Sequence, residues 1–255
     1  MADGKFQTAL KLLYPPRCIG CGAMVESDFG LCGSCWRDTS FIGGTICDTC
    51  GVPLAGELGQ DALHCDDCLV IARPWRKGRA ALAYNDTGRK MVLALKHGDR
   101  AVIARPAALW LIAAGRDIFD NDTLLVPVPL HWRRLLKRRY NQSALLTRAL
   151  ARETGMESCP DLLVRTEATK SLEGLGREQR FEMLQNAIRI HPKRKNLIKN
   201  RKIVLVDDVM TSGATFAAAT EACQRAGAGD VCVLSLIHIS EPTRHICLSR
   251  MPSSA

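Results

Sequence analysis

Four Cys-x-x-Cys pairs lie between residues 18 and 68 and constrain the N-terminal part of this 255-residue chain more than any other feature. Two thiolates separated by two residues converge on one metal ion from a tight turn, and a second such turn completes a tetrahedral sulfur shell that suits zinc. The pairs therefore predict two structural zinc sites, because every ligand position is filled and none is left for a substrate. The eight predicted ligands are Cys18, Cys21, Cys32, Cys35, Cys47, Cys50, Cys65 and Cys68.

Buried free thiols or a redox pair are the alternatives, and either would need this spacing to recur four times by accident. The pairing of the four turns stays open at this point. The turns can combine sequentially, 18/21 with 32/35 and 47/50 with 65/68, or in a crossed arrangement. Because few apolar residues lie between the cysteines, we expect this segment to depend on metal for its folding.

The chain begins without the continuous apolar stretch of a secretory signal, and no segment approaches the roughly 18 uncharged apolar residues of a spanning helix. We therefore expect a cytoplasmic protein with no membrane insertion. Cytosolic thiols are kept reduced, so the cysteines indicate metal ligation and argue against a disulfide framework.

Charge divides the chain in the same place as the cysteines. Residues 1–74 carry a net charge of −4 and residues 75–255 a net charge of +13, within a composition that is 47% hydrophobic and 24% charged. This composition is that of a globular protein and excludes a disordered or collagen-like chain. The basic part predicts a polyanionic partner, either nucleic acid or a phosphorylated small molecule. We expect a double zinc-ribbon module over 1–73 and a second domain over 74–235.

Short apolar runs alternate with helical patterns after the linker at 73–78. The expected strands are 80–84, 124–128, 203–207 and 231–237, and the expected helices are 89–96, 102–114, 142–153 and 215–226, the last ended by Gly227. Continuous apolar strands that alternate with helices predict an α/β fold with a mostly parallel sheet covered on both faces.

One segment, residues 203–215, contains most of the recognisable chemistry. An apolar strand ends in Asp207 and Asp208, and a turn of small residues then opens a helix. Backbone N–H groups at such a helix N-terminus bind anions, and the two acids suit sugar hydroxyls or a divalent cation a short distance along the same ligand. The segment therefore predicts a sugar-phosphate ligand; an ordinary buried strand followed by a capped helix is the alternative.

Residues 203–215 resemble the phosphoribosyl pyrophosphate signature of type I phosphoribosyltransferases. The resemblance implies that Asp207 and Asp208 hold the ribose hydroxyls at the catalytic centre, with Mg²⁺ bound alongside phosphoribosyl pyrophosphate. It also implies that the 5′-phosphate is held by Thr211, Ser212, Gly213, Ala214 and Thr215.

The whole chain, over roughly residues 10 to 236, resembles the competence protein F family. The matching elements are the cysteine module, LKHGD at 95–99, Pro127 to His131, Tyr140 to Gln142 and the signature itself. The resemblance implies a type I phosphoribosyltransferase-like domain after the double zinc ribbon. By comparison with related transferases, Arg133 and Arg134 would approach the pyrophosphate, where guanidinium groups suit phosphate oxygens. Lys96 is a further candidate; the alternative is a helix C-terminal cation.

The segment 165–190 departs from the family pattern. It occupies the place of the mobile loop that closes over substrate in such transferases, but Leu172 stands where the family has Gln, and Met183 to Ile188 differ from the family's Asn-x-x-Gly-Ala-Phe. These departures weaken the expectation of catalysis more than that of the fold.

Two functions follow as hypotheses. The first is transfer of a phosphoribosyl group to an unknown nitrogen acceptor, with no residue identifiable as the base. The second is non-catalytic binding of single-stranded DNA in DNA uptake or processing, with the zinc module docking a DNA-uptake helicase or another protein. Residues 183–202 contain seven Lys or Arg and no acid, which suits a nucleic-acid backbone or a solvated connector equally well.

The C-terminus, residues 236–255, is expected to be a tail outside the fold. Its SLIHISEPTR segment resembles the translation of a sequencing adapter, which predicts that residues from about Leu236 onward are not native. A natural disordered tail is the alternative.

Overall fold

A five-stranded parallel sheet forms the centre of the larger domain. The computed structural model describes residues 15–26, 30–56, 62–96, 103–131, 135–136, 140–166 and 187–239. The strands, in spatial order, are β1 (Gly78–Ala83), β7 (Val231–His238), β6 (Ile203–Met210), β2 (Leu124–Pro127) and β3 (Glu157–Ser158). Every pairing is parallel, which confirms the predicted sheet.

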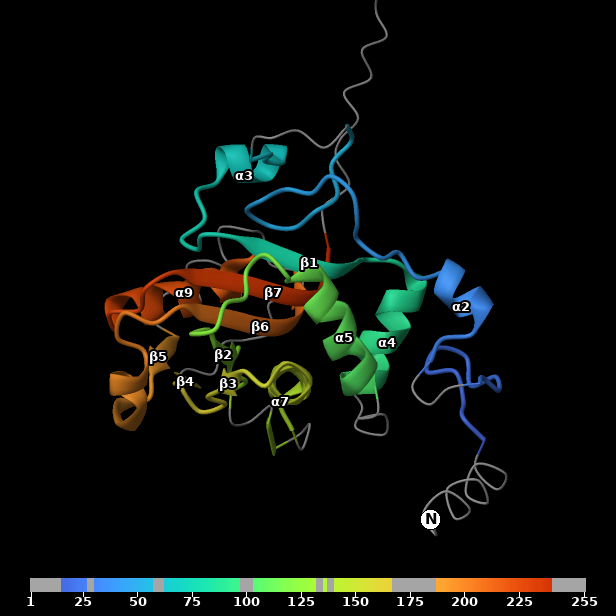
Figure 1. Cartoon of the computed structure of the whole chain (residues 1–255). Coiled ribbons are helices and arrows are strands. Elements are labelled where there is room, and N and C mark those ends of the chain that lie inside the picture. Colours follow the sequence, from blue (N-terminus) through green and yellow to red (C-terminus); the bar gives the residue numbers. More distant parts are fainter. Residues whose placement is uncertain are drawn as a thin grey trace, which may run out of the picture.

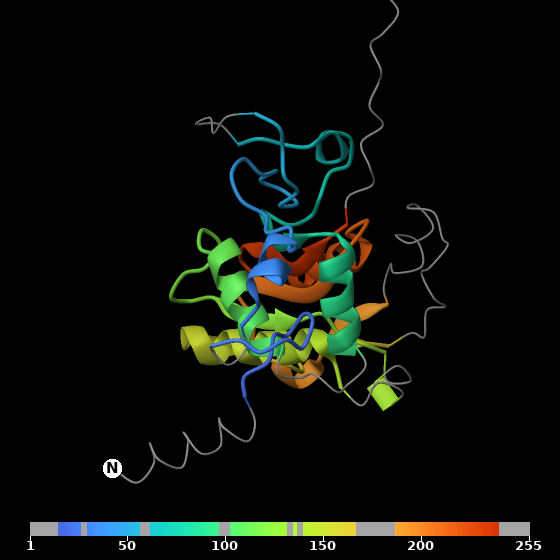
Figure 2. The ribbon, with the colours of Figure 1, turned by 90° about the vertical axis from the view of Figure 1, so that its right-hand side faces the viewer.

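Helices cover both faces of the sheet, as the sequence predicts (Figures 1 and 2). Alternate residues of β6 face opposite sides: Val204 and Val206 pack with one set of helices, and Ile203 and Leu205 with the other. The first set comprises α4 (Asp86–Lys96), α5 (Ala104–Ala114) and α7 (Gln142–Thr154). The other face is covered by α9 (Ala214–Arg225) with the antiparallel pair β4 (Leu163–Arg165) and β5 (Ile188–Ile190), followed by η2 (Pro192–Leu197).

The cysteine-rich module lies along the outer edge of β1. It contains two short helices, α2 (Gly33–Arg37) and α3 (Asp66–Val70). The segment between its two halves pairs with β1, because Ile42 N–H donates to the Ala81 carbonyl and Ala83 N–H to the Ser40 carbonyl, each at 2.9 Å. The module thereby covers an edge strand that would otherwise expose unpaired backbone groups.

Three helices begin at positions different from those expected, and α5 is the one that starts later, at Ala104. Helix α4 starts at Asp86, three residues early, because the Asn85 side chain accepts a hydrogen bond from Gly88 N–H at 2.8 Å and caps the helix. Helix α9 starts at Ala214, with Gly213 as its N-cap.

Both β6 and β7 run further than expected, and one ladder explains both differences. Strand β6 continues through the two aspartates to Met210, which pairs with His238 of β7. The expected tail outside the fold therefore does not begin at Leu236, because Leu236, Ile237 and His238 belong to β7 and are buried in the sheet. Residues 240–255 lie outside the described residues. Among the described residues, the helices are too short or too polar to cross a membrane.

Candidate functional site

The two aspartates of the signature lie together near the C-terminal end of β6. Ser143, in the first turn of α7, donates from its hydroxyl group to Asp207 Oδ1 at 2.6 Å. The backbone N–H of Asp208 donates to the same oxygen at 2.9 Å. Both residues are half-buried, and Asp208 Oδ2 is inaccessible to solvent. The strand therefore presents two oxygen ligands at the edge where ligands bind in parallel α/β sheets.

Burial and the neighbouring charge of Asp208 raise the pKa of Asp207 to about 8. The hydrogen bonds from Ser143 and the Asp208 backbone oppose this shift without cancelling it. At neutral pH the pair therefore carries one proton more than two ordinary carboxyl groups. A divalent cation would displace that proton, and carboxylate oxygens are suitable ligands for a hard cation such as Mg²⁺.

The small-residue turn directly follows the acid pair and leads into α9. Gly213 adopts φ 77°, in the left-handed region that favours glycine, and the helix begins at the next residue. Thr211 is exposed, Ser212 and Thr215 are half-buried, and Gly213 and Ala214 are buried. The first N–H groups of a helix have no intrahelical partner, so residues 211–215 can bind an anion. We name them the phosphate loop after the ligand that the sequence predicts.

The Tyr-Asn-Gln element positions α7 against the sheet. Tyr140 donates from its hydroxyl group to the Leu95 carbonyl at 2.5 Å, and the Asn141 side chain donates to the Val128 carbonyl at 2.9 Å. Asn141 also caps the helix, because its side-chain oxygen accepts from the Ser143 N–H. The element thus determines where Ser143 lies relative to Asp207, a role that the sequence alone did not reveal.

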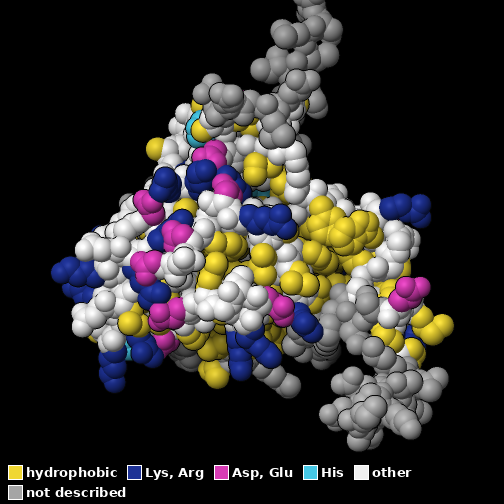
Figure 3. Space-filling view, viewed as in Figure 1, with side chains coloured by type: hydrophobic (Ala, Val, Ile, Leu, Met, Phe, Trp, Pro, Cys, Tyr) yellow, Lys and Arg dark blue, Asp and Glu magenta, His cyan; other side chains and the backbone are white. Residues whose placement is uncertain are grey.

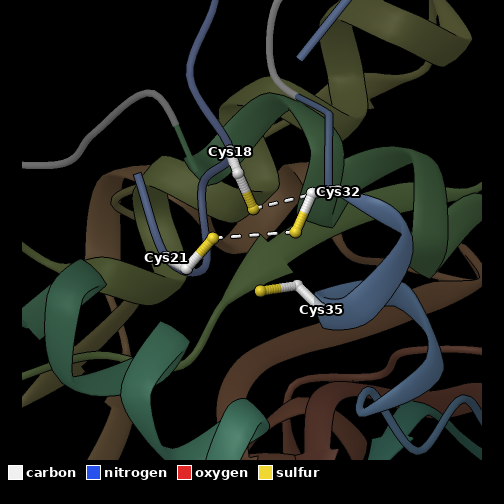
Figure 4. Close-up of side chains that lie close together, drawn as sticks. All are labelled: Cys18, Cys21, Cys32 and Cys35. Carbon is white, nitrogen blue, oxygen red and sulfur yellow. Dashed lines mark hydrogen bonds between the residues drawn. The ribbon is translucent and has the colours of Figure 1, made fainter. Parts of the chain in front are cut away.

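The eight cysteines of the four pairs form two clusters, and the pairing is sequential. One cluster contains the sulfur atoms of Cys18, Cys21, Cys32 and Cys35, and the other those of Cys47, Cys50, Cys65 and Cys68. Within each cluster all ligand atoms lie within 4.8 Å of one another, and those of the first converge from two turns (Figure 4). These are the donor sets of structural zinc sites.

The thiols of the first cluster differ in acidity: the pKa of Cys32 is lowered, whereas burial and the neighbouring thiols raise the pKa of Cys35. The Ser34 hydroxyl lies 3.1 Å from Cys32 Sγ. Hydrogen bonding from Ser34 and from the Cys35 backbone lowers the pKa of the Cys32 thiol to about 6. A lowered thiol pKa favours the thiolate, which is the metal-binding form.

The second cluster is attached to the sheet by a buried cation. Arg79 of β1, 5% exposed, donates to Asp48 at 2.7 Å and to Asp117 at 2.6 Å. Asp48 lies between the ligands Cys47 and Cys50. Figure 3 shows acidic and basic side chains interspersed on this side of the molecule. The second ribbon is therefore held against the sheet by charge pairing.

Several predicted site residues cannot be placed. Arg133 and Arg134 lie outside the described residues. The same is true of residues 167–186, which make up most of the segment that departs from the family pattern. Lys96 is the last residue of α4, and its side chain is not among those described. Of the predicted ribose-phosphate ligands, the structure brings together the acid pair and the loop 211–215.

The comparisons with known proteins cover both parts of the chain. A family model described as a double zinc ribbon domain matches residues 9–69. The chain is 29% identical over 226 residues to "Competence protein F" of Haemophilus influenzae, covering 86% of this chain and 96% of that protein. It is 30% identical over 216 residues to "DNA utilization protein YhgH" of Escherichia coli K12, covering 82% of this chain and 90% of that protein.

Solved structures show only distant likeness. Adenine phosphoribosyltransferase from Leishmania tarentolae is 14% identical, with a TM-score of 0.35 over 62% of this chain and 91% of that one. The corresponding enzyme from Thermoanaerobacter pseudethanolicus is 16% identical, with a TM-score of 0.35 over 55% and 82%.

Proposed function

The chain belongs to the competence protein F family, and on that premise we propose that it binds single-stranded DNA in DNA uptake or DNA processing. The names of its relatives support this function, since they refer to competence and to DNA utilization. The main structural support comes from the seven cations of residues 183–202. Some of them form ion pairs with acids of the same molecule, and the others do not.

Three of these seven cations are engaged with acids of the same molecule. Arg194 pairs with Asp161, Arg201 with Glu157 and Lys202 with Asp120, each at 2.9 Å. The other four are exposed and have no acidic partner among the described residues; they are Arg189, Lys193, Lys195 and Lys199. These four are therefore available to neutralise DNA phosphates.

A shallow cavity of about 330 Å³ adjoins the unpaired set. Arg189, Lys195 and Arg225 line it, together with the apolar side chains of Ile188, Ile190, Pro192, Ala222 and Ala226. The cations that line it suit the backbone phosphates of a single strand. The lining contains no aromatic side chain on which a base could stack, so we expect contacts to phosphate to dominate here.

The test is the salt dependence of affinity for a single-stranded oligonucleotide, measured by fluorescence anisotropy. Changing Arg189, Lys193, Lys195 and Lys199 to Gln should weaken binding and reduce the slope of log K against log salt by about 0.7 for each cation that contacts a phosphate. The matched control changes Arg194, Arg201 and Lys202 to Gln and should keep most of the slope. Salt-insensitive binding, or an equal loss in both variants, would contradict the proposal.

A second candidate function is binding of phosphoribosyl pyrophosphate with Mg²⁺, favoured by the acid pair beside the loop 211–215. In this proposal Asp207 and Asp208 hold the ribose hydroxyls, and the loop N–H groups hold the 5′-phosphate. Arg133, Arg134 and Lys96 would serve the pyrophosphate. Bound Mg²⁺ would neutralise charge on the leaving pyrophosphate.

With an acceptor present, phosphoribosyl transfer would break the bond between the anomeric carbon and pyrophosphate oxygen and form a bond to nitrogen. Pyrophosphate would leave with the bonding electron pair, and the acceptor nitrogen would lose a proton. The chain's own contribution is to position the two anionic ends of the ligand.

Calorimetric titration of phosphoribosyl pyrophosphate with Mg²⁺ into the zinc-loaded chain tests this function. The matched variant carries Asp207→Asn and Asp208→Asn, which retain side-chain size and remove charge. Binding by the wild type that the variant loses would support the site. A folded wild type that does not bind would mean that the acid pair and loop serve only as scaffold.

A further inference from the structure

The linker between the second zinc ribbon and β1 lies against the back of the phosphate loop. We propose that Arg73 and Trp75 are positioning residues that couple the second zinc site to the phosphate loop, so that loss of this zinc impairs binding of a phosphate there. This inference rests on the second candidate function, in which the loop holds the 5′-phosphate of phosphoribosyl pyrophosphate.

Arg73 determines the orientation of one peptide unit of the loop. Its Nη1 atom donates to the Ser212 carbonyl at 2.5 Å. The carbonyl of Ser212 and the N–H of Gly213 belong to the same planar trans peptide, and they point in opposite directions. By holding the carbonyl, Arg73 directs the Gly213 N–H away from itself, toward the other side of the loop.

Trp75 leaves no free space behind Gly213. A Cβ atom on Gly213 would lie 2.9 Å from Trp75 Cη2 and 3.0 Å from Arg73 Nη1. The indole ring is buried and makes an edge contact with Phe216 in the first turn of α9, with ring centroids 6.3 Å apart. The guanidinium carbon of Arg73 lies 5.5 Å from the centroid of the same ring, within the range of a cation–π interaction.

The other side of Trp75 contacts the second zinc ribbon. Its indole N–H donates to the Thr49 carbonyl at 2.6 Å. Thr49 lies between the ligands Cys47 and Cys50, and Cys47, Cys50 and Trp75 share one core cluster with Phe216. Metal binding and folding are coupled in small cysteine-rich modules. The position of the Thr49 carbonyl, and with it that of the indole ring, therefore depends on an occupied zinc site.

The first readout is amide hydrogen exchange of residues 211–216 in the full chain without phosphate ligand. A variant with Cys47→Ser and Cys50→Ser should exchange at least tenfold faster in this segment than the wild type. The matched control, Cys18→Ser and Cys21→Ser, removes ligands of the first site and should leave exchange there unchanged. Equal exchange in the two variants would overturn the proposal.

Two further variants leave the cysteines intact, so that zinc content and folding can be checked separately. Arg73→Met removes the donor to Ser212, and Trp75→Phe removes the donor to Thr49 while keeping an aromatic ring. Each should retain two zinc ions, accelerate exchange at 211–216 and weaken the affinity for phosphoribosyl pyrophosphate with Mg²⁺ at least tenfold. Unchanged exchange in both variants would overturn the coupling.

The two readouts separate failure of the coupling from failure of the proposed ligand. If the wild type does not bind phosphoribosyl pyrophosphate, the second candidate function fails, but the exchange comparison still tests the coupling between zinc site and loop.

Discussion

The hydroxyl group of Ser143 donates a hydrogen bond of 2.6 Å to Asp207, which joins the N-terminus of α7 to the acid pair of β6. Asn141 caps the same helix and binds the end of β2. Helix α7 and strand β6 therefore meet at this carboxyl group, and Asn141 connects the same helix to the residue that follows β2.

Changing Asp207 to Asn should stabilise the protein increasingly as pH rises from 5 to 8. Burial and the charge of Asp208 raise the pKa of Asp207 to about 8. The folded state therefore keeps a proton that the unfolded state releases above its ordinary pKa, and the free energy of unfolding falls as pH rises toward 8. Urea unfolding at several pH values measures this difference. At pH 8 the free energy of unfolding of the variant should exceed that of the wild type by at least about 1.4 kcal/mol, the equivalent of one pKa unit.

Changing Ser143 to Ala should act in the opposite direction. Its hydrogen bond lowers the pKa of Asp207, so its loss raises that pKa further and removes about 1 kcal/mol of stability at pH 8. Thr154→Ala is the control, because its hydroxyl group donates to the Leu150 carbonyl in the same helix, away from the acid pair. A pH-independent difference between Asp207→Asn and the wild type would contradict both expectations.

Changing Gly213 to Ala should abolish anion binding at the loop and destabilise the fold. The residue has φ 77°, and a Cβ atom would lie 2.9 Å from Trp75 Cη2. Gly227→Ala is the matched control: it has φ 88° with nothing within 4 Å of a Cβ atom. The control should be destabilised by about 1–2 kcal/mol, the cost of placing a Cβ atom on a left-handed backbone. The Gly213 variant should be destabilised clearly more. If thermal unfolding showed the same loss of stability in both variants, the contact with Trp75 would add no cost, which would contradict this expectation.

Changing Arg79 to Met should destabilise the attachment of the second ribbon. The buried guanidinium group donates to both Asp48 and Asp117. Its removal leaves these two carboxylates with Lys77 alone, whose Nζ lies 3.4 Å from each. Despite burial, which opposes ionisation, these bonds lower the pKa of Asp117. We expect a loss of about 3 kcal/mol in urea unfolding.

Arg76→Met is the control for Arg79, because Arg76 pairs with Asp230 on the exposed surface. It should cost clearly less stability than the Arg79 change, because solvent-exposed ion pairs contribute little. If the two variants were equally stable, the pairs of Arg79 with Asp48 and Asp117 would contribute no more to stability than the surface pair of Arg76 with Asp230.

The purified chain should contain two zinc ions. Changing Cys65 and Cys68 to Ser should remove one zinc ion and lower the unfolding temperature of the sheet domain, because this ribbon packs directly against β1 through Arg79. Elemental analysis and calorimetry measure the two effects. Retention of both zinc ions in this variant would contradict the assignment of the clusters.

The spacing of residues along the chain was sufficient to predict the features that depend on local geometry. Two cysteines separated by two residues lie on one turn wherever the chain folds, so the ligands of both zinc sites could be recognised. The apolar run followed by Asp207, Asp208 and a small-residue turn likewise predicts a strand, an acid pair and a helix N-terminus, and β6 and α9 confirm this order.

The identity of the distant residues that contact these features follows from the folded chain and not from local spacing. Ser143 reaches Asp207 across 64 positions of the chain, and Arg73 reaches Ser212 across 139. The sequential pairing of the cysteines and the extension of β7 to His238 were settled in the same way. The physical reason is that such contacts depend on strand register and on how helices and ribbons pack across the sheet, which local residue spacing does not specify.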